Sequence, residues 1–255
     1  MRKTSYISFF IIIAIVISAF SINKSNPKTG VFRLETSAKT FIAGTEVTLT
    51  FSTEDGSAPQ LFINNSYGST LLSPEQKEDK LMYIIPSVFS KKAGILNWLL
   101  VNEGETILKN NIEILPNISS ETLIESYLGP RSIQAGNRDY SMLVVIPTDK
   151  FDNPLPKDTS VKINEQFLDN ISSKEVKTKN LIIWNNIMAK EKSGSILVSS
   201  SCNTTNSNEL TTVIYPSNAT NFTINFERNH PFADGNQITQ LSTSKIIDEF
   251  GNTIS

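Results

Sequence analysis

The amino-acid sequence repeats itself about every hundred residues, and this period limits the fold more than any other feature of the chain. Residues 91–96 (KKAGIL) and 112–116 (IEILP) are matched one hundred positions later by 191–196 (EKSGSI) and 212–216 (TVIYP). A fixed period of this size indicates tandem copies of one small domain. Roughly a hundred residues is enough for a seven-stranded β-sandwich with a core of its own.

A second pair of matching segments marks the first half of each copy. One copy contains Gly136-Asn137 and the run Asp149-Lys150-Phe151-Asp152-Asn153-Pro154-Leu155. Ninety-nine positions later stand Gly235-Asn236 and Asp248-Glu249-Phe250-Gly251-Asn252-Thr253-Ile254. Because both halves of the unit recur at nearly the same spacing, the repeat is a property of whole domains.

Most segments of the repeat have the pattern of β-strands. The segment 46–51 alternates apolar and polar residues, which is the mark of a strand with one buried face. Only residues 73–80 hint at a helical turn. The alternation therefore predicts all-β units.

The repeat divides the chain into unit 1 (31–117), unit 2 (121–217) and unit 3 (221–255), which is the N-terminal half of a copy. Gly44 and Gly136 are ninety-two positions apart, whereas later segments are one hundred apart, so unit 2 has about eight extra residues. We expect this insertion in a surface loop. Half a sandwich cannot cover its apolar face, so we expect unit 3 to belong to a longer array; pairing with another partner is the alternative.

Composition excludes several classes of partner. The net charge is −2 and there is no long basic run, so nothing indicates nucleic acid or an anionic membrane surface as partner. The single cysteine, Cys202, cannot form an internal disulfide, and the units must depend on their apolar cores. We expect Cys202 to be a small, half-buried strand residue; a cross-link between two chains is the alternative.

The N-terminus has the pattern of an export signal. Arg2 and Lys3 precede the apolar stretch 7–20, and a polar stretch follows. We predict a signal peptide over residues 1–21 and a linker over 22–30. An uncleaved signal anchor is the alternative, and it would be the only part of the chain in a membrane. Both interpretations place the rest of the chain outside the cytoplasm.

The run at 149–155 resembles the bacterial immunoglobulin-like repeats of the invasin and intimin kind. The run at 248–254 is closer still to their Asp-x-x-Gly-Asn-x-hydrophobic signature, which unit 1 lacks. The pairs Ala93-Gly94 and Ser193-Gly194 resemble the entry to a late strand of such folds. The resemblance implies an all-β fold of tandem immunoglobulin-like β-sandwich domains, the last one incomplete, after an N-terminal signal helix. It also implies a stalk on a bacterial surface.

No group of residues has the makeup of a catalytic site, and we predict that the protein is not an enzyme. His230, the only histidine, could join Asp234 in a Ser-His-Asp site, but beside Pro231 we expect a solvated turn residue. One histidine and one cysteine are too few for a zinc site, and no phosphate-binding glycine loop occurs. We therefore expect no cofactor and no metal.

A calcium site is the one metal centre that the sequence suggests. Asp149, Asp152, Asn153 and Glu165 could supply oxygen ligands at the end of a unit. Gly251 takes the place of Asp152 in the next copy, however. A turn built by Asp and Asn explains the same residues better.

Two tryptophans bear on sugar binding. Trp98 and Trp184 could stack on sugar rings, but both lie in strand runs where we expect core positions. Aromatic side chains between the sheets favour a spacer, and an aromatic row on one sheet face favours sugar binding. Asn-x-Ser/Thr sequons matter only in a host that glycosylates; those after residue 30 begin at Asn64, Asn117, Asn170, Asn203, Asn218 and Asn221.

Together these patterns predict an exported, non-enzymatic cell-surface protein whose tandem units act as a spacer or as an adhesion or interaction module. The alternative is a carbohydrate-binding or accessory module of a larger secreted enzyme. The expected partner is a protein or a polysaccharide at the cell surface.

Overall fold

The computed structural model describes residues 32–54, 56–236 and 238–254. The predicted signal peptide (1–21) and linker (22–30) lie outside these residues and stay predictions. Almost all described elements are β-strands, which confirms the all-β fold. In the part of the chain that the structure describes, no helix is long and apolar enough to cross a membrane.

Unit 1 is a sandwich of two sheets with the strand orders β1-β3-β7-β6 and β2-β9-β8-β4-β5. Leu49, Phe51 and Tyr83 are among its largest fully buried side chains, and they belong to one apolar core. The strands are β1 (Phe32–Leu34), β2 (Thr40–Ile42), β3 (Thr48–Thr53), β4 (Gln60–Asn65), β5 (Gly68–Leu72), β6 (Glu75–Lys77), β7 (Lys80–Ile84), β8 (Gly94–Asn102) and β9 (Glu105–Leu115).

Unit 2 is a second sandwich with a core of its own. Its sheets have the strand orders β10-β12-β15 and β11-β18-β16-β13-β14, and β17 pairs with β16. Leu143, Ile183 and Ile196 are buried in this second core. The strands are β10 (Thr122–Gly129), β11 (Ser132–Gln134), β12 (Tyr140–Asp149), β13 (Ser160–Phe167), β14 (Asn170–Lys177), β15 (Ile183–Met188), β16 (Gly194–Cys202), β17 (Thr205–Asn206) and β18 (Leu210–Tyr215).

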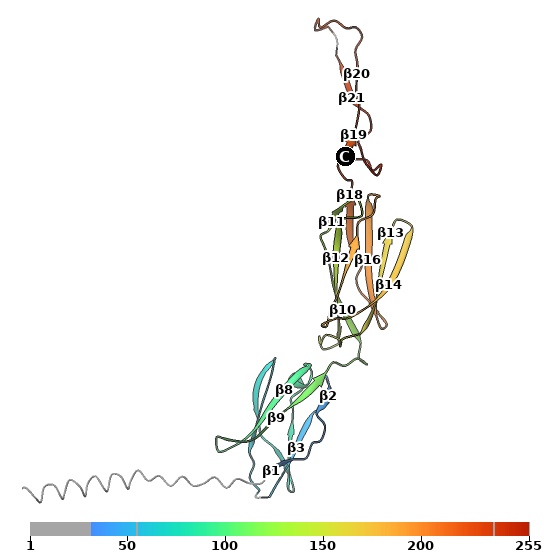
Figure 1. Ribbon diagram of the computed structural model, residues 1–255. Helices are drawn as coiled ribbons and strands as arrows, with labels where there is room; N and C mark the ends of the chain where they lie inside the picture. Colours follow the sequence, from blue (N-terminus) through green and yellow to red (C-terminus); the bar gives the residue numbers. More distant parts are fainter. Residues whose placement is uncertain (1–31, 55, 237, 255) are drawn as a thin grey trace, which may run out of the picture.

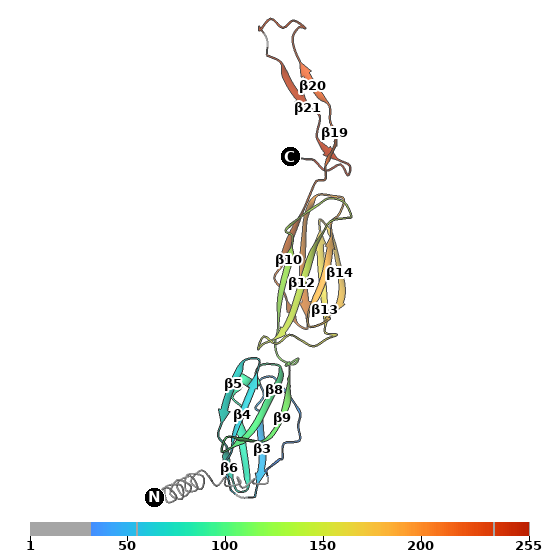
Figure 2. The same ribbon diagram turned by 60° about the vertical axis from the view of Figure 1, so that its left-hand side comes forward.

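The two sandwiches are copies of one plan. In each, a short early strand pairs in parallel with the last long strand: Thr40 pairs with Glu113 in unit 1, and Ser132 pairs with Val213 in unit 2. These pairs reproduce the offsets of ninety-two and one hundred seen in the sequence. Figures 1 and 2 show the sandwiches end to end, as expected for tandem immunoglobulin-like domains.

The extra residues of unit 2 lie between β12 and β13. With Gly44 equivalent to Gly136, the end of β3 corresponds to the middle of β12, which continues to Asp149 and is followed by a long turn. Residues 146–159 of unit 2 therefore stand where unit 1 has only 54–59. This insertion meets unit 1, because Asn153 hydrogen bonds to Lys91.

The helical turn is not where the sequence suggested it. Within residues 73–80 the structure has strand β6, which pairs with β7, and the helical turn α2 lies at Ser87–Ser90. Pro86 precedes α2. Proline fits the start of a helix because its missing N–H would have no intrahelical partner there.

Unit 3 is a long hairpin without a covering sheet (Figure 1). It consists of β19 (Ala219–Asn221), β20 (Ile224–Glu227), β21 (Gln240–Thr243) and β22 (Ile247–Asp248). Phe226 pairs with Leu241, just as Leu128 pairs with Leu143 in unit 2. Leu143 is 1% exposed whereas Leu241 is 70% exposed. The hairpin thus has the strand pairing of the first half of a unit, but no second sheet packs on it among the described residues.

We expect the two cores to respond separately to mutation. Leu96 and Ile196, one hundred positions apart, are both fully buried, one in each core. Leu96→Ala should destabilise unit 1 by about 2–5 kcal/mol through the lost side chain and the cavity left behind. Ile196→Ala should do the same to unit 2. Calorimetry of the full chain should show each variant lowering a different transition; equal shifts of both transitions would contradict two cores.

Candidate functional site: the joints between units

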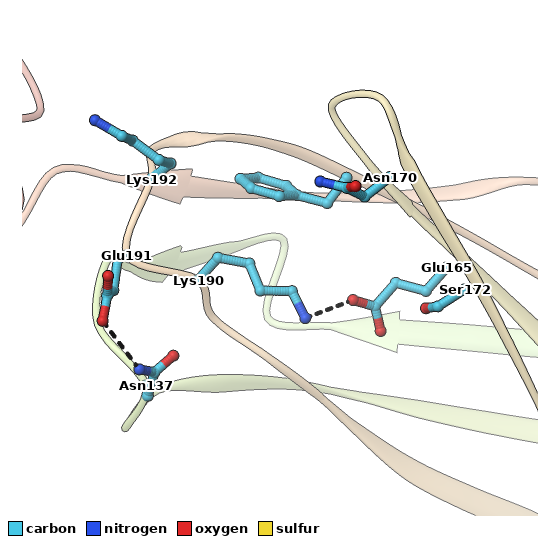
Figure 3. A pocket seen from close by; sticks show the side chains of 8 residues that line it. Asn137, Glu165, Asn170, Ser172, Lys190, Glu191 and Lys192 are labelled. Atoms are coloured by element: carbon cyan, nitrogen blue, oxygen red, sulfur yellow. Dashed lines mark hydrogen bonds and ion pairs between the residues drawn. The ribbon is translucent and has the colours of Figure 1, made fainter.

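The structure does not assemble the suggested calcium ligands. Asp149 and Asn153 lie together, but Asp152 is exposed, and Glu165 forms an ion pair with Lys190 at 2.7 Å. That ion pair is part of a separate polar pocket of about 430 Å³ (Figure 3). Among the described residues, no group of three or more His, Cys, Asp and Glu side chains could hold a metal ion.

The other candidate residues are scattered. His230 lies in the exposed loop between β20 and β21, where its Nε2 is 3.6 Å from Asp234 Oδ2. Cys202 is buried at the end of β16, more deeply than expected, and burial raises the pKa of its thiol. Neither residue takes part in the joint contacts described below.

The two tryptophans differ in environment. Trp98 is 3% exposed and packs edge-on against Phe51, with ring centres 5.4 Å apart, as expected for a core residue. The core position expected for Trp184 is wrong, because its side chain is 60% exposed. Along β15 it is Ile183, its neighbour, that faces the core, and strand alternation turns Trp184 outward.

A buried carboxylate organises the turn that follows β12. Asp149 Oδ1 accepts hydrogen bonds from the backbone N–H groups of Phe151 at 2.9 Å and Asn153 at 3.0 Å. The side-chain amide of Asn153 donates to both oxygens of Asp149, at 3.1 and 2.9 Å. These donors replace the water that the fully buried carboxylate has lost. The Asp and Asn of the predicted turn therefore form one hydrogen-bonded group.

The same asparagine reaches across to unit 1. Asn153 Nδ2 donates to the backbone carbonyl of Lys91 at 2.8 Å, and its Oδ1 accepts from the backbone N–H of Ala93 at 2.9 Å. The backbone N–H of Asn117, at the end of unit 1, donates to Asp149 Oδ2 at 2.9 Å. All three partners in unit 1 are main-chain groups. The joint thus recognises the backbone of unit 1.

Phe151 adds an apolar contact to this joint. It packs against the core of unit 1, over Gly44, where a Cβ atom would come within 2.3 Å of two ring carbons. Gly44 also has a φ of +81°, which favours glycine. The ammonium groups of Lys91 and Lys150 lie 5.8 and 5.0 Å from the ring centre, within the range of cation–π attraction.

The joint between units 2 and 3 repeats the carboxylate arrangement. Asp248 Oδ1 accepts from the N–H groups of Phe250 at 3.0 Å and Asn252 at 2.8 Å. Its Oδ2 accepts from the N–H of Ser217 and from Asn252 Nδ2, both at 2.8 Å. Each of these residues stands ninety-nine or one hundred positions after its counterpart in the first joint.

Asn252 crosses to the preceding unit as Asn153 does. Its Nδ2 donates to the carbonyl of Glu191 at 2.7 Å, and its Oδ1 accepts from the N–H of Ser193 at 2.9 Å. Phe250 packs against the core of unit 2, and a Cβ on Gly136 would lie 3.4 Å from its ring. Two successive joints are therefore built from the same contacts.

Hydrogen bonding keeps both joint carboxyls ionised. Burial of Asp149 opposes the charge, but hydrogen bonds from the Asn153 side chain and from three backbone N–H groups outweigh it and lower the pKa of this carboxyl. For Asp248, desolvation again opposes the charge, and the hydrogen bonds lower its pKa to about 2. Both groups are carboxylates at neutral pH.

The sequence showed the two halves of this joint but not their contact. The Asp-x-Phe-x-Asn run and the 91–94 and 191–194 segments both stood out as repeats. The two segments recur with nearly equal offsets, ninety-nine and one hundred. This shared offset was the signal available in the sequence, because two segments that contact each other at every joint are repeated with the same period. The expected surface loop of unit 2 is in fact the segment that makes the joint.

We expect alanine to be tolerated differently at the two glycines. Both have positive φ, which costs an alanine about 1–2 kcal/mol. Only at Gly44 would the new Cβ meet the Phe151 ring and displace it. Gly44→Ala should therefore lower the hydrogen-exchange protection of the Ala93 N–H in the first joint. The matched variant Gly136→Ala should leave Ser193 N–H protected in the second; equal losses would contradict the packing described.

We also expect the second joint to loosen in acid. Because the folded-state pKa of Asp248, about 2, lies below the ordinary value of about 3.9, its stabilising effect is complete above pH 4. It is lost as the pH falls toward 2. The protection factor of the Ser193 N–H, corrected for intrinsic exchange, should fall over this range. In Asp248→Asn it should be low and independent of pH; an unchanged dependence would refute the assignment.

Comparison with known proteins bears on the fold. No protein-family model matches the chain, and a search of curated proteins finds no match. Among solved structures, the FdeC adhesin of Escherichia coli matches with a TM-score of 0.56 at 13% identity, covering 88% of this chain and 74% of that one. Invasin, a bacterial integrin-binding protein, matches with a TM-score of 0.50 at 14% identity, covering 89% of this chain and 48% of that one.

A glycosyl hydrolase family 2 member from Bacteroides cellulosilyticus matches with a TM-score of only 0.33 at 15% identity, covering 68% of this chain and 23% of that one. The chain thus spans about three quarters of the FdeC structure and about half of invasin. At these identities the likeness concerns the fold alone. It confirms the predicted resemblance: units 1 and 2 are immunoglobulin-like β-sandwiches of the kind found in invasin and the FdeC adhesin.

Proposed function

We propose that the protein is an exported, non-enzymatic component of a bacterial cell surface, in which immunoglobulin-like units form a stiff stalk that spaces or presents an interaction surface. The observation that carries this proposal is the repeated joint. Asp149 and Asn153 bind unit 2 to unit 1 with the contacts that Asp248 and Asn252 use between units 3 and 2.

Stiffness follows from the kind of contact at each joint. Domains joined by a bare linker move relative to one another by default. Here the carboxylate, the bridging amide and the phenylalanine all act across or at the joint, and charge-assisted hydrogen bonds are stronger and more directional than neutral ones. Because successive joints are alike, each unit has the same orientation relative to the unit before it. The units therefore form an extended array, as in other repeat proteins.

The similar proteins agree with this role. FdeC is an adhesin, and invasin is an integrin-binding protein. The apolar N-terminal stretch supports export, which stays a prediction from residues 1–21. A polysaccharide-binding role needs an aromatic row on a sheet face, and unit 2 has such a row on a surface that the joints do not use.

The proposal is tested by the shape of the full chain in solution. Small-angle X-ray scattering should give a distribution of interatomic distances with the long tail of a rod. The double variant Asp149→Asn, Asn153→Ala should give a smaller radius of gyration, because the carboxylate hydrogen bonds, worth about 1.5–3 kcal/mol each, are lost and the units can bend relative to one another. Asp169→Asn, in the exposed turn between β13 and β14, is the matched control and should leave the curve unchanged.

Exposure at the cell surface is tested separately. Protease added to intact bacteria that express the full chain should digest units 1 and 2. Protection of the chain until the cells are broken would refute the surface location. A scattering curve that is the same for the wild type and the double variant would refute the stalk.

A further inference from the structure

The outer face of the three-stranded sheet of unit 2 carries two exposed aromatic side chains in one row. Tyr127 on β10 pairs with Val144 on β12, and Val144 pairs with Trp184 on β15. Directly paired residues point to the same side of a sheet. The rows on either side contain core residues, Leu143 in one and the Val145–Ile183 pair in the other, so the Tyr127–Val144–Trp184 row faces away from the core.

The two rings are well placed to act together. Tyr127 is 59% and Trp184 60% exposed, and only the short side chain of Val144 stands between them. They are two strands apart, or about 9.5 Å at the usual strand spacing. Farther along the same face lie the partly exposed side chains of Met142 and Met188. The result is an apolar strip across the sheet.

The strip is nearly free of charge. Of the residues that β10, β12 and β15 turn outward around this row, Glu125 is the only one charged at neutral pH, and its carboxylate accepts a hydrogen bond from the Tyr127 hydroxyl at 3.4 Å. Asn186 supplies an amide between Trp184 and Met188. A ligand matched to this surface is therefore uncharged.

Grooves with both apolar and polar linings adjoin the strip on the two edges of the sheet. A groove of about 600 Å³ beside β10 includes Tyr127, Arg131 and Glu209. A smaller groove of about 220 Å³ beside β15 includes Asn186 and Lys190. It shares Glu165, Ser172 and Lys190 with the polar pocket of Figure 3, where these side chains come close together. Hydrogen-bonding groups thus border the aromatic strip on either side.

We propose that this face of unit 2 binds a neutral, flat polysaccharide chain, whose sugar rings stack on Tyr127 and Trp184. A pyranose ring has an apolar face of C–H groups and a rim of hydroxyls. The first fits an exposed aromatic ring, and the second fits the amide and charged side chains of the grooves. A β-1,4-linked chain is flat enough to contact both rings, whereas an α-1,4-linked chain curves away. This binding role is separate from the stalk proposed above.

A protein partner fits this face less well. The centre of a protein interface is a broad, desolvated apolar area enclosed by a polar rim. Here the apolar strip is narrow, and charged side chains line the grooves beside it: Arg131 and Glu209 next to Tyr127, and Lys190 next to Asn186. Aromatic rings and hydrogen-bonding side chains lie close together here, as the apolar faces and the hydroxyl groups of a sugar chain do.

The test is calorimetric titration of the full chain with cellohexaose, a β-1,4-linked hexasaccharide, and with maltohexaose, its α-1,4-linked counterpart. We expect binding of cellohexaose and at least tenfold weaker binding of maltohexaose. Trp184→Ala and Tyr127→Ala should each weaken cellohexaose binding at least tenfold. Tyr215→Ala is the matched control, since Tyr215 is 57% exposed but belongs to the other sheet of unit 2, and it should change the affinity less than twofold.

Three results would overturn the proposal: no binding of cellohexaose at millimolar concentration, equal binding by Trp184→Ala, or self-association of the wild type that Trp184→Ala abolishes. The last would make this face a contact between two copies. Circular dichroism of each variant checks that the sandwich is intact, which we expect because the substituted side chains are exposed. None of these results would alter the scattering test of the stalk.

Discussion

The ionised carboxylate of Asp149 holds the first joint together, and the positions of the other groups at this joint depend on it. Bound by the N–H groups of Phe151 and Asn153, it fixes the turn after β12. Bound by the amide of Asn153, it orients that side chain so that its remaining hydrogen-bonding groups meet the Lys91 carbonyl and the Ala93 N–H. A neutral side chain of the same size could not accept from all of these donors.

Burying a charge is costly unless hydrogen bonds replace its water, and both joints meet this condition. The lowered pKa of Asp149 and of Asp248 expresses the same balance, since the donors favour the charged form more than burial disfavours it. The phenylalanine two residues on then adds apolar contact with the preceding core. At each joint the carboxylate thus shapes the turn, the asparagine amide bridges the two units, and the phenylalanine ring excludes water.

The sequence predicted the fold well, because the repeat and the strand alternation are local or periodic signals. It also identified the Asp-x-Phe-x-Asn run, though as a turn and not as a joint, since a contact between units leaves no pattern within either one. Trp184 was assigned to the wrong face. The apolar run 181–184 does not show which of its residues face the core, and the matching run 81–84, whose Ile84 is also exposed, does not show it either. The helical turn was misplaced because 73–80 lacks apolar residues to fix its pattern.

The groups that each unit offers to the bridging asparagine of the next are main-chain atoms. Lys91 and Glu191 have opposite charges, and Ala93 and Ser193 differ in polarity, yet each pair makes the same hydrogen bonds. These side chains can therefore change without loss of the asparagine hydrogen bonds, provided that the glycine beneath the phenylalanine ring is kept. A lineage built from such modules can gain or lose whole units by recombination while these receiving side chains diverge.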